Sequence, residues 1–163
     1  MIRAYVALGA NLGHPAATVR AALAELAGIP ESALDAASSL YRTAPLGLKH
    51  QPDFINAVAA VDTALAPLAL LEALFAIEAR FGRSRSVPNA PRTLDLDLLL
   101  YGDTRLNEAQ LTLPHPRMHQ RAFVLAPLAE IAPECRIPGR GTVLELLAGC
   151  RDQGIVRIES IES

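Results

Sequence analysis

The amino-acid sequence predicts an α+β fold, a ferredoxin-like α/β sandwich whose helices pack on a mostly antiparallel central sheet. Apolar segments of strand length alternate with segments of helical spacing in the order strand–helix–strand, strand–helix–strand. Each of the two predicted helices begins at a proline and ends at a glycine. With 163 residues, 51% of them hydrophobic, the chain is long and apolar enough for one globular domain, residues 1–163.

The first half of the sandwich is predicted from the N-terminal part of the chain. Residues 2–8 are typical of a buried strand, which ends in the turn Gly9-Ala10-Asn11-Leu12-Gly13. Pro15 begins a helix and Gly28 ends it, because proline suits the first turn and glycine suits the end of a helix. Its apolar side chains recur every three or four residues: Ala16, Val19, Leu23 and Leu26. Residues 34–42 predict the second strand.

The second half repeats this order. A polar loop over residues 43–53 leads to a strand at residues 54–62 and then to a helix from Pro67 to Gly82. The loop of residues 83–93 joins this helix to a strand at residues 94–101. The side chains expected on the buried side of the second helix are Leu68, Leu71, Leu74, Phe75 and Phe81.

Beyond residue 101 the pattern is less regular. The segment Pro114-His115-Pro116-Arg117-Met118 is predicted to be irregular, because proline lacks the backbone donor that helices and strands require. A partly helical apolar stretch runs from Arg121 to Ala132. Thr142-Val143-Leu144-Glu145 is a capping-box pattern, which predicts a short last helix.

Two carboxylates lie on one face of the strand at residues 94–101. Because side chains alternate along a strand, Asp95 and Asp97 share a face and lie about 7 Å apart. The opposite face would carry Leu94, Leu96, Leu98 and Leu100. Carboxylates this close repel each other unless cations lie beside them, and Mg²⁺ is commonly held by one or two carboxylates plus substrate phosphates. A chance Asp-x-Asp on a strand is the alternative.

Arginines precede these carboxylates without an acidic residue between Glu78 and Asp95: Arg80, Arg83, Arg85 and Arg92. Guanidinium groups bind phosphate oxygens with two parallel hydrogen bonds. Such a group of arginines is often only a solvated surface. Its position next to two potential metal ligands nevertheless indicates a phosphoryl-transfer site.

Four further side chains are candidates for a ligand site. Phe54 and Asn56 point to the same side of their strand, and an aromatic ring beside an amide suits a flat heterocycle. A core phenylalanine and a capping asparagine are the alternative. His115 between two prolines suits a phosphate contact or a plain surface position. Glu78 lies on the apolar side of its helix, so it points into the site or ends the helix exposed.

Composition narrows the class of protein. The net charge of −2 gives no overall basic surface for nucleic acid. Lys49 is the single lysine, so a phosphate-binding loop of the Gly-x-x-x-x-Gly-Lys-Ser/Thr type is excluded. Cys135 and Cys150 are isolated and read as reduced thiols. Without a signal peptide or a long apolar run, we expect a cytoplasmic monomer with neither nucleic-acid nor membrane partners.

Three segments, together with the opening turn at Gly9–Gly13, resemble the signatures of the 6-hydroxymethyl-7,8-dihydropterin pyrophosphokinases, enzymes of the folate pathway. They are Tyr41-Arg42-Thr43-Ala44-Pro45-Leu46-Gly47, Pro91-Arg92-Thr93-Leu94-Asp95-Leu96-Asp97, and Pro114-His115-Pro116-Arg117-Met118 continued by Arg121-Ala122-Phe123. The similarity runs in order from about residue 2 to residue 135. It implies transfer of pyrophosphate from ATP to the hydroxymethyl group of the pterin, with release of AMP.

The resemblance also implies roles for residues of this chain. Asp95 and Asp97 would hold two Mg²⁺ ions, and Arg83 and Arg85 would act in catalysis. The nucleotide and its phosphates would be contacted by Glu78, Arg92, Leu98, His115 and Arg121. The pterin pocket would be lined by Thr43, Ala44, Leu46, Phe54, Asn56 and Phe123, with the ring stacked between the two phenylalanines.

One feature departs from the family, and two other functions remain open. Many members carry a tryptophan in the loop before Pro91, where this chain has Val87-Pro88-Asn89-Ala90 and no tryptophan anywhere. A metal-dependent nucleotidyltransferase also pairs Asp-x-Asp with metal, but would not release AMP from ATP. An RNA-binding ferredoxin-like module would need exposed aromatic residues on its central strands, and the chain has few aromatic residues.

Overall fold

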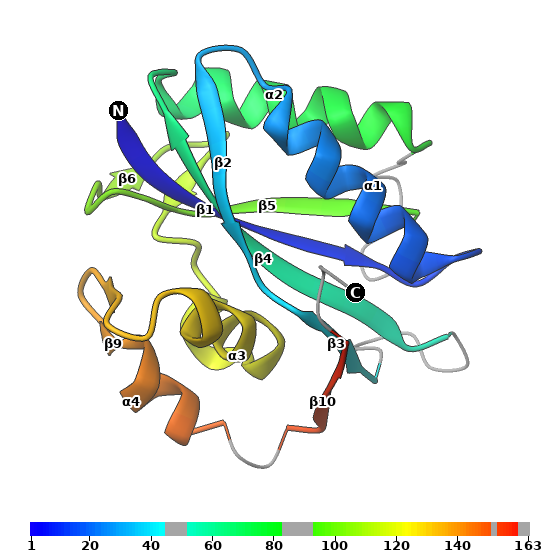
Figure 1. Ribbon diagram of the computed structural model, residues 1–163. Coiled ribbons are helices and arrows are strands. Elements are labelled where there is room, and N and C mark those ends of the chain that lie inside the picture. The colour runs from blue at the N-terminus through cyan, green and yellow to red at the C-terminus, as the bar shows by residue number, and fades with distance from the viewer. Residues whose placement is uncertain (45–51, 83–92, 151–152, 160–163) are drawn as a thin grey trace.

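The computed structural model describes residues 1–44, 52–82, 93–150 and 153–159 (Figure 1). Its main sheet has six strands, with the order β10-β3-β4-β1-β5 and with β2 also paired to β4. The bounds are β1 Ile2–Ala10, β2 Ser32–Ala37, β3 Leu40–Thr43, β4 Phe54–Thr63, β5 Asp95–Tyr101 and β10 Ile155–Glu159. Every strand pairing among the described residues is antiparallel.

The connections follow the predicted order. Helix α1 (Pro15–Ala27) joins β1 to β2 and β3, and helix α2 (Pro67–Arg80) joins β4 to β5. In the sheet, strand β1 lies between β4 and the edge strand β5. Both helices begin at proline, and α1 ends at Gly28, as the sequence predicts. The α+β class with a mostly antiparallel sheet is confirmed.

Helices cover both faces of the sheet (Figure 1). Helices α1 and α2 pack on one face over a core that includes Leu8 of β1 and Leu96 of β5. The opposite face carries α3 (Ala122–Ile131) and α4 (Val143–Ala148), whose core includes Leu125 and Val143. The side of the sheet that faces α3 therefore also receives Asp95 and Asp97, which alternate with the leucines of the first core.

A bulge changes the direction of side chains on β5. Tyr5 pairs with Leu100 and Val6 with Leu98, so Leu99 is skipped in the pairing with β1. The prediction that Leu100 shares a face with Leu94, Leu96 and Leu98 is therefore wrong, because Leu100 packs in the core with α3. Asp95 and Asp97 lie before the bulge and keep regular pairing.

The buried face of α2 also differs from the prediction. Leu68 and Phe75 are 36% and 41% exposed, whereas Leu70 and Ile77 are fully buried with Leu71 and Leu74. Phe81 packs at the margin of the core. Because α2 is apolar on more than one side, the spacing of its apolar residues alone does not fix which side faces the sheet.

Short elements complete the chain. The predicted strand at residues 34–42 is divided, because Ser38 and Ser39 interrupt it between β2 and β3. Two small hairpins, β6 (Leu106–Asn107) with β7 (Thr112–Leu113) and β8 (Arg136–Ile137) with β9 (Gly141–Thr142), were not predicted, and neither was β10, which pairs with β3. A 3₁₀ turn at Met118–Gln120 precedes α3.

The last helix has the predicted cap. The hydroxyl of Thr142 accepts a hydrogen bond from the backbone N–H of Glu145, and the carboxylate of Glu145 accepts from the backbone N–H of Thr142. This reciprocal pair satisfies two donors that the start of a helix otherwise leaves free. Within the described ranges, none of the helices has the length and apolar character needed to span a bilayer.

Candidate active site

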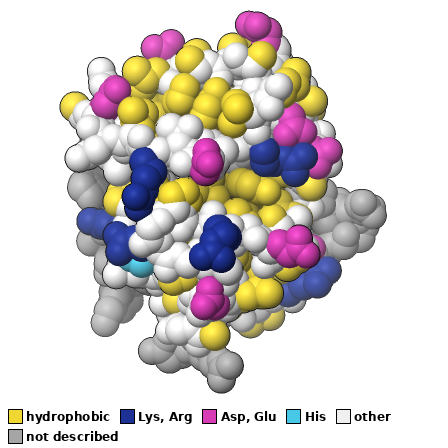
Figure 2. Space-filling model, turned by 90° about the vertical axis from the view of Figure 1, so that its left-hand side faces the viewer, with side chains coloured by type: hydrophobic (Ala, Val, Ile, Leu, Met, Phe, Trp, Pro, Cys, Tyr) yellow, Lys and Arg dark blue, Asp and Glu magenta, His cyan; other side chains and the backbone are white. Residues whose placement is uncertain are grey.

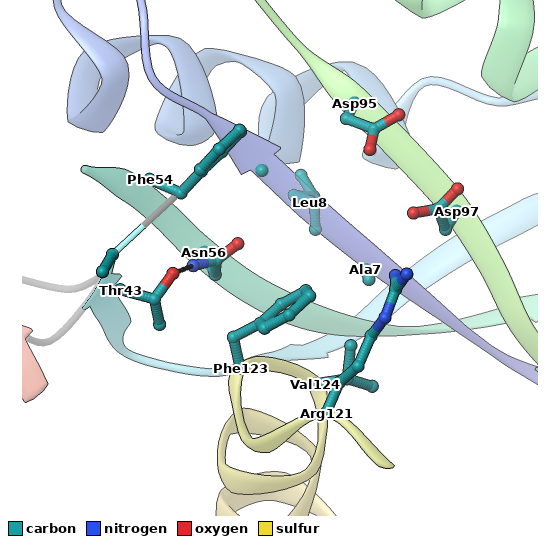
Figure 3. Close-up of a pocket in the computed structure, with 12 residues that line it drawn as sticks. Ala7, Leu8, Thr43, Phe54, Asn56, Asp95, Asp97, Arg121, Phe123 and Val124 are labelled. Carbon is teal, nitrogen blue, oxygen red and sulfur yellow. Dashed lines mark hydrogen bonds between the residues drawn. The ribbon is translucent and has the colours of Figure 1, made fainter. Parts of the chain in front are cut away.

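A pocket lies on the face of the sheet that looks toward α3, and it collects side chains from strands and helix (Figure 3). Eight of its lining residues were predicted for the site: Thr43, Ala44, Phe54, Asn56, Asp95, Asp97, Arg121 and Phe123. Sequence reasoning missed the remaining lining residues, which are Ala7, Leu8, Gly9 and Val124.

One row of paired residues sets the width of this pocket. Asn56 of β4 pairs with Gly9 of β1, and Gly9 pairs with Asp95 of β5. Since neighbouring strands lie about 4.8 Å apart, the backbones of Asn56 and Asp95 are separated by about 10 Å. In Figure 3, β1 crosses between these two side chains. An amide and a carboxylate therefore face one cavity from opposite sides of the central strand.

Asn56 is held firmly in this row. Its side chain is 5% exposed, and its Nδ2 donates a hydrogen bond of 2.9 Å to the hydroxyl oxygen of Thr43 on β3. The amide therefore does not cap a helix, which was one alternative from the sequence. With Nδ2 committed to Thr43, the orientation of Oδ1 is fixed as well.

Two aromatic side chains flank Asn56 in the view of Figure 3. Phe54 begins β4 and Phe123 lies in the first turn of α3. Both are partly exposed rather than fully buried, and Phe123 also packs against the core under α3. The guanidinium of Arg121 lies 5.4 Å from the centre of the Phe123 ring, within the range of a cation–π interaction.

The two carboxylates fit a hard divalent cation. Asp95 and Asp97 both line the pocket and are both partly exposed. Among the described residues, no cluster of three or more His, Cys, Asp or Glu side chains suits a metal. Two carboxylates with room beside them match the way Mg²⁺ binds, because this ion keeps several waters and takes further oxygens from substrate phosphates.

A second groove opens on the other side of Asp97. It is lined by α2, β5 and the segment after β6: Leu71, Phe75, Leu96, Asp97, Leu98, Ala109, Gln110, Leu111, Thr112, His115 and Pro116. The groove brings the predicted Leu98 and His115 together and shares Asp97 with the first pocket. Phe75 of α2, which is 41% exposed, forms one of its walls.

His115 is neutral in this setting. Burial and the positive charge of Arg121 lower the pKa of His115 to about 4, against the opposing charge of Asp95. Its Nδ1 accepts a hydrogen bond of 3.2 Å from the backbone N–H of Arg117, so the ring proton is on Nε2. The imidazole can therefore offer one N–H donor to the groove without carrying a charge.

This pKa predicts how stability depends on pH. As pH falls through 6.5 the unfolded chain protonates His115, whereas the folded chain does so only near pH 4. The free energy of unfolding should therefore fall by up to about 3 kcal/mol between pH 6.5 and pH 4 because of this group. We expect His115→Asn to reduce that loss, measured by urea unfolding at both pH values.

The exposed His14 provides the matched control for this experiment. His14→Asn should leave the difference in unfolding free energy between the two pH values as it is in the unsubstituted chain. If both variants keep the full pH dependence, another group causes it.

Glu78 is buried behind β5. Its side chain is 1% exposed, and Oε2 accepts a hydrogen bond of 2.7 Å from the backbone N–H of Leu96. The alternative of an exposed helix-end glutamate is therefore wrong. Glu78 lines neither the pocket nor the groove. Its carboxylate instead occupies the outer edge of β5 between the two aspartates, where a neighbouring strand would otherwise pair.

The remaining predicted residues divide into two groups. Arg80 forms an ion pair of 2.7 Å with Glu25 of α1 and is 57% exposed, so it belongs to the solvated surface. Leu46, Arg83, Arg85 and Arg92 lie outside the described residues, as does the segment Val87–Ala90.

The family of the chain follows from its sequence. Residues 5–133 match the family model of 7,8-dihydro-6-hydroxymethylpterin-pyrophosphokinase (HPPK). The chain belongs to this family. The 2-amino-4-hydroxy-6-hydroxymethyldihydropteridine pyrophosphokinase of Pseudomonas aeruginosa is 51% identical over 156 residues, which cover 96% of each chain. The protein of the same name from Haemophilus influenzae is 42% identical over 97% of this chain and 99% of its own.

Solved structures show the same fold. HPPK-DHPS crystallised in complex with substrates matches with a TM-score of 0.69 at 14% identity, over 91% of this chain and 43% of that one. Plasmodium falciparum HPPK-DHPS with STZ-DHP matches with a TM-score of 0.68 at 17% identity, over 91% of this chain and 41% of that one. The chain therefore spans less than half the length of either HPPK-DHPS chain.

As an HPPK, the chain is an enzyme of folate biosynthesis. It transfers a pyrophosphoryl group from its co-substrate ATP to hydroxymethyldihydropterin. Family membership decides in favour of this reaction over the nucleotidyltransferase and RNA-binding alternatives.

Figure 2 shows one face of the molecule, on which acidic and basic side chains are interspersed rather than gathered by sign.

Proposed function

We propose that the pocket binds the pterin, that the groove binds the nucleotide, and that the reaction takes place where they meet at Asp97. The observation that carries this proposal is that both cavities are lined by Asp97. A carboxylate common to two cavities is where a metal ion can touch both substrates. Pyrophosphate transfer requires such a meeting point, because the pterin hydroxyl must reach the β-phosphorus of ATP.

The pocket suits the pterin by shape and by hydrogen bonding. Phe54 and Phe123 supply aromatic faces for the flat ring, and Asn56 supplies an amide whose Oδ1 accepts from its edge. Thr43 fixes that amide, and Ala44 also lines the pocket. Leu46, which we also assign to this pocket, lies outside the described residues.

The groove suits the base and the phosphates of ATP. Its apolar walls, Leu98 among them, can cover a purine ring, and Nε2 of His115 can donate to a phosphate oxygen. Arg121 offers a guanidinium from the pocket side. Glu78 serves the nucleotide region indirectly, since it holds the backbone of β5 between Asp95 and Asp97.

We assign two Mg²⁺ ions to Asp95 and Asp97. When bound, such ions neutralise the triphosphate and polarise the attacking and leaving oxygens. The protein residues position the reactants: the pterin hydroxyl oxygen bonds to the β-phosphorus, and its proton passes to the solvent. The bond between that phosphorus and the α–β bridging oxygen breaks, and AMP leaves.

Product analysis tests this reaction. The enzyme is incubated with ATP, Mg²⁺ and 6-hydroxymethyl-7,8-dihydropterin, and the nucleotides are separated. AMP in equal amount to the pterin diphosphate is the expected result. ADP as the product would indicate a monophosphate kinase, and free pyrophosphate would indicate a nucleotidyltransferase.

Arg83 and Arg85, outside the described residues, are predicted to act on the transition state. Arginines that stabilise a transferring phosphoryl group contribute about 10³–10⁵ in rate. Arg83→Ala and Arg85→Ala should each lower the rate of the chemical step by at least about 10²-fold, with a much smaller change in the dissociation constant for ATP. Single-turnover kinetics measures both quantities. Weaker ATP binding at an unchanged chemical rate would make them binding residues only.

We also propose that residues 1–163 act as a single domain, as a monomer in the cytoplasm. The isolated thiols Cys135 and Cys150 support a reducing compartment. Sedimentation at micromolar concentration, with and without substrates, measures the oligomeric state.

A further inference from the structure

Gly9 occupies the centre of the site. It pairs with Asn56 on one side and with Asp95 on the other, and it lines the pocket between them. Glycine is disfavoured inside a strand relative to alanine, because it lacks a side chain to pack and loses more freedom on folding. No positive φ accounts for a glycine here, since Gly9 has ordinary strand geometry. The reason for it therefore lies in what surrounds it.

A methyl group at position 9 would press on Asn56. A Cβ built there lies 3.1 Å from Oδ1 of Asn56 and 4.0 Å from the backbone oxygen of Ile55, and apart from the adjacent residues no other described atom lies within 4 Å. The first distance is shorter than nine in ten real contacts of a Cβ atom, so Oδ1 would have to move by a few tenths of an ångström. Asp95 is not among the crowded groups.

Asn56 cannot move without weakening its hydrogen bond to Thr43 or its contact with the pocket. Its side chain is buried, and its Nδ2 already donates to the hydroxyl of Thr43 at 2.9 Å. A rotation that relieves the contact with position 9 lengthens this bond or turns Oδ1 away from the pocket. The same methyl group would also stand above the floor of the pocket, which at Gly9 and the neighbouring Ala7 is close to bare backbone.

We propose that Gly9 is a specificity-determining residue for the pterin. This inference rests on the proposed function of the pocket and adds the residue that allows a flat ring to lie across β1. The row from Asn56 to Asp95 spans two strand spacings, or about 10 Å, which suits a planar bicyclic ring with its edge at Asn56 and its hydroxymethyl group toward Asp95. Any side chain at position 9 raises the floor in the middle of that span.

Gly9→Ala tests the inference by binding. Titration calorimetry measures the binding of 6-hydroxymethyl-7,8-dihydropterin in the presence of Mg²⁺ and a non-hydrolysable ATP analogue. A second titration measures the binding of the analogue without the pterin. We expect the dissociation constant for the pterin to rise at least about fivefold and that for the analogue to stay within about twofold. The melting temperature should change little, because the preference of a strand for alanine over glycine offsets the strain at Asn56.

Gly154→Ala is the matched control, since a Cβ at Gly154 meets nothing within 4 Å and the residue lies away from both cavities. It should leave both dissociation constants unchanged. If the dissociation constant for the pterin rises less than fivefold in Gly9→Ala, the inference is wrong and the proposed function is unaffected. Equal loss for both ligands also overturns the inference, because Gly9 would then support the fold rather than the pterin. Failure of the unsubstituted chain to bind the pterin overturns the proposed function and the inference together.

Discussion

Replacing Asp97 with asparagine is expected to lower kcat by about 10³-fold, equivalent to about 4 kcal/mol of transition-state stabilisation. Asparagine has nearly the same shape as aspartate but cannot neutralise a divalent cation. Asp97 lines both the pocket and the groove, so its charge acts on both substrates. Steady-state kinetics at saturating ATP and pterin measures the effect.

Asp95→Asn should also lower kcat, but with a different effect on binding. Asp95 lines the pocket alone, so its loss should weaken binding of Mg²⁺ and ATP less than Asp97→Asn does. Asp103, on the exposed turn after β5, supplies the control: Asp103→Asn should keep full activity. The unfolding free energy without Mg²⁺ should not fall in either site variant, because removing one of two neighbouring negative charges relieves repulsion. Full activity of Asp97→Asn at millimolar Mg²⁺ would contradict the metal assignment.

The sequence predicts the frame of the fold because local signals and packing agree there. Pro15 and Pro67 mark the starts of both long helices, and apolar segments mark the three longest strands, β1, β4 and β5. The bulge at Leu99 is different, since it arises from pairing with β1 and has no local signal in a run of leucines. Strand β10 is short and gains its conformation from β3, more than a hundred residues away in the chain.

The site was predicted unevenly for a related reason. Side chains that carry chemistry, such as Asp95 and Asn56, attract attention in a sequence, and the structure brings them into one pocket. Gly9 carries no chemistry, and its position matters only once three strands are aligned. Glu78 could be placed on the apolar side of α2, but its bond to Leu96 depends on how α2 packs against the edge of β5. Long-range pairing therefore determines what the residue pattern leaves open.

Asn56→Leu is expected to weaken pterin binding by at least about 10²-fold, with about 10⁴-fold as the limit for a site built around hydrogen bonds. Leucine fills about the same volume, so the pocket should keep its shape while losing both the donor and the acceptor. Binding of an ATP analogue with Mg²⁺ should change by less than about threefold, because Asn56 does not line the groove. Titration calorimetry with each ligand measures the two effects separately.

Thr43→Val separates the hydrogen bond between Asn56 and Thr43 from the contact of Asn56 with the pterin. It removes the oxygen that accepts from Nδ2 of Asn56 but leaves the amide in the pocket. If Thr43 acts by orienting the amide, this variant should weaken pterin binding by about tenfold, less than Asn56→Leu, since one neutral hydrogen bond contributes about 1 kcal/mol and a buried unsatisfied donor costs somewhat more. Thr43→Ser keeps the hydroxyl and should bind the pterin as the unsubstituted chain does.

Equal loss of pterin and nucleotide binding in Asn56→Leu would mean that Asn56 supports the sheet rather than the ligand. If Thr43→Val binds the pterin as the unsubstituted chain does, Asn56 is oriented by the pterin itself.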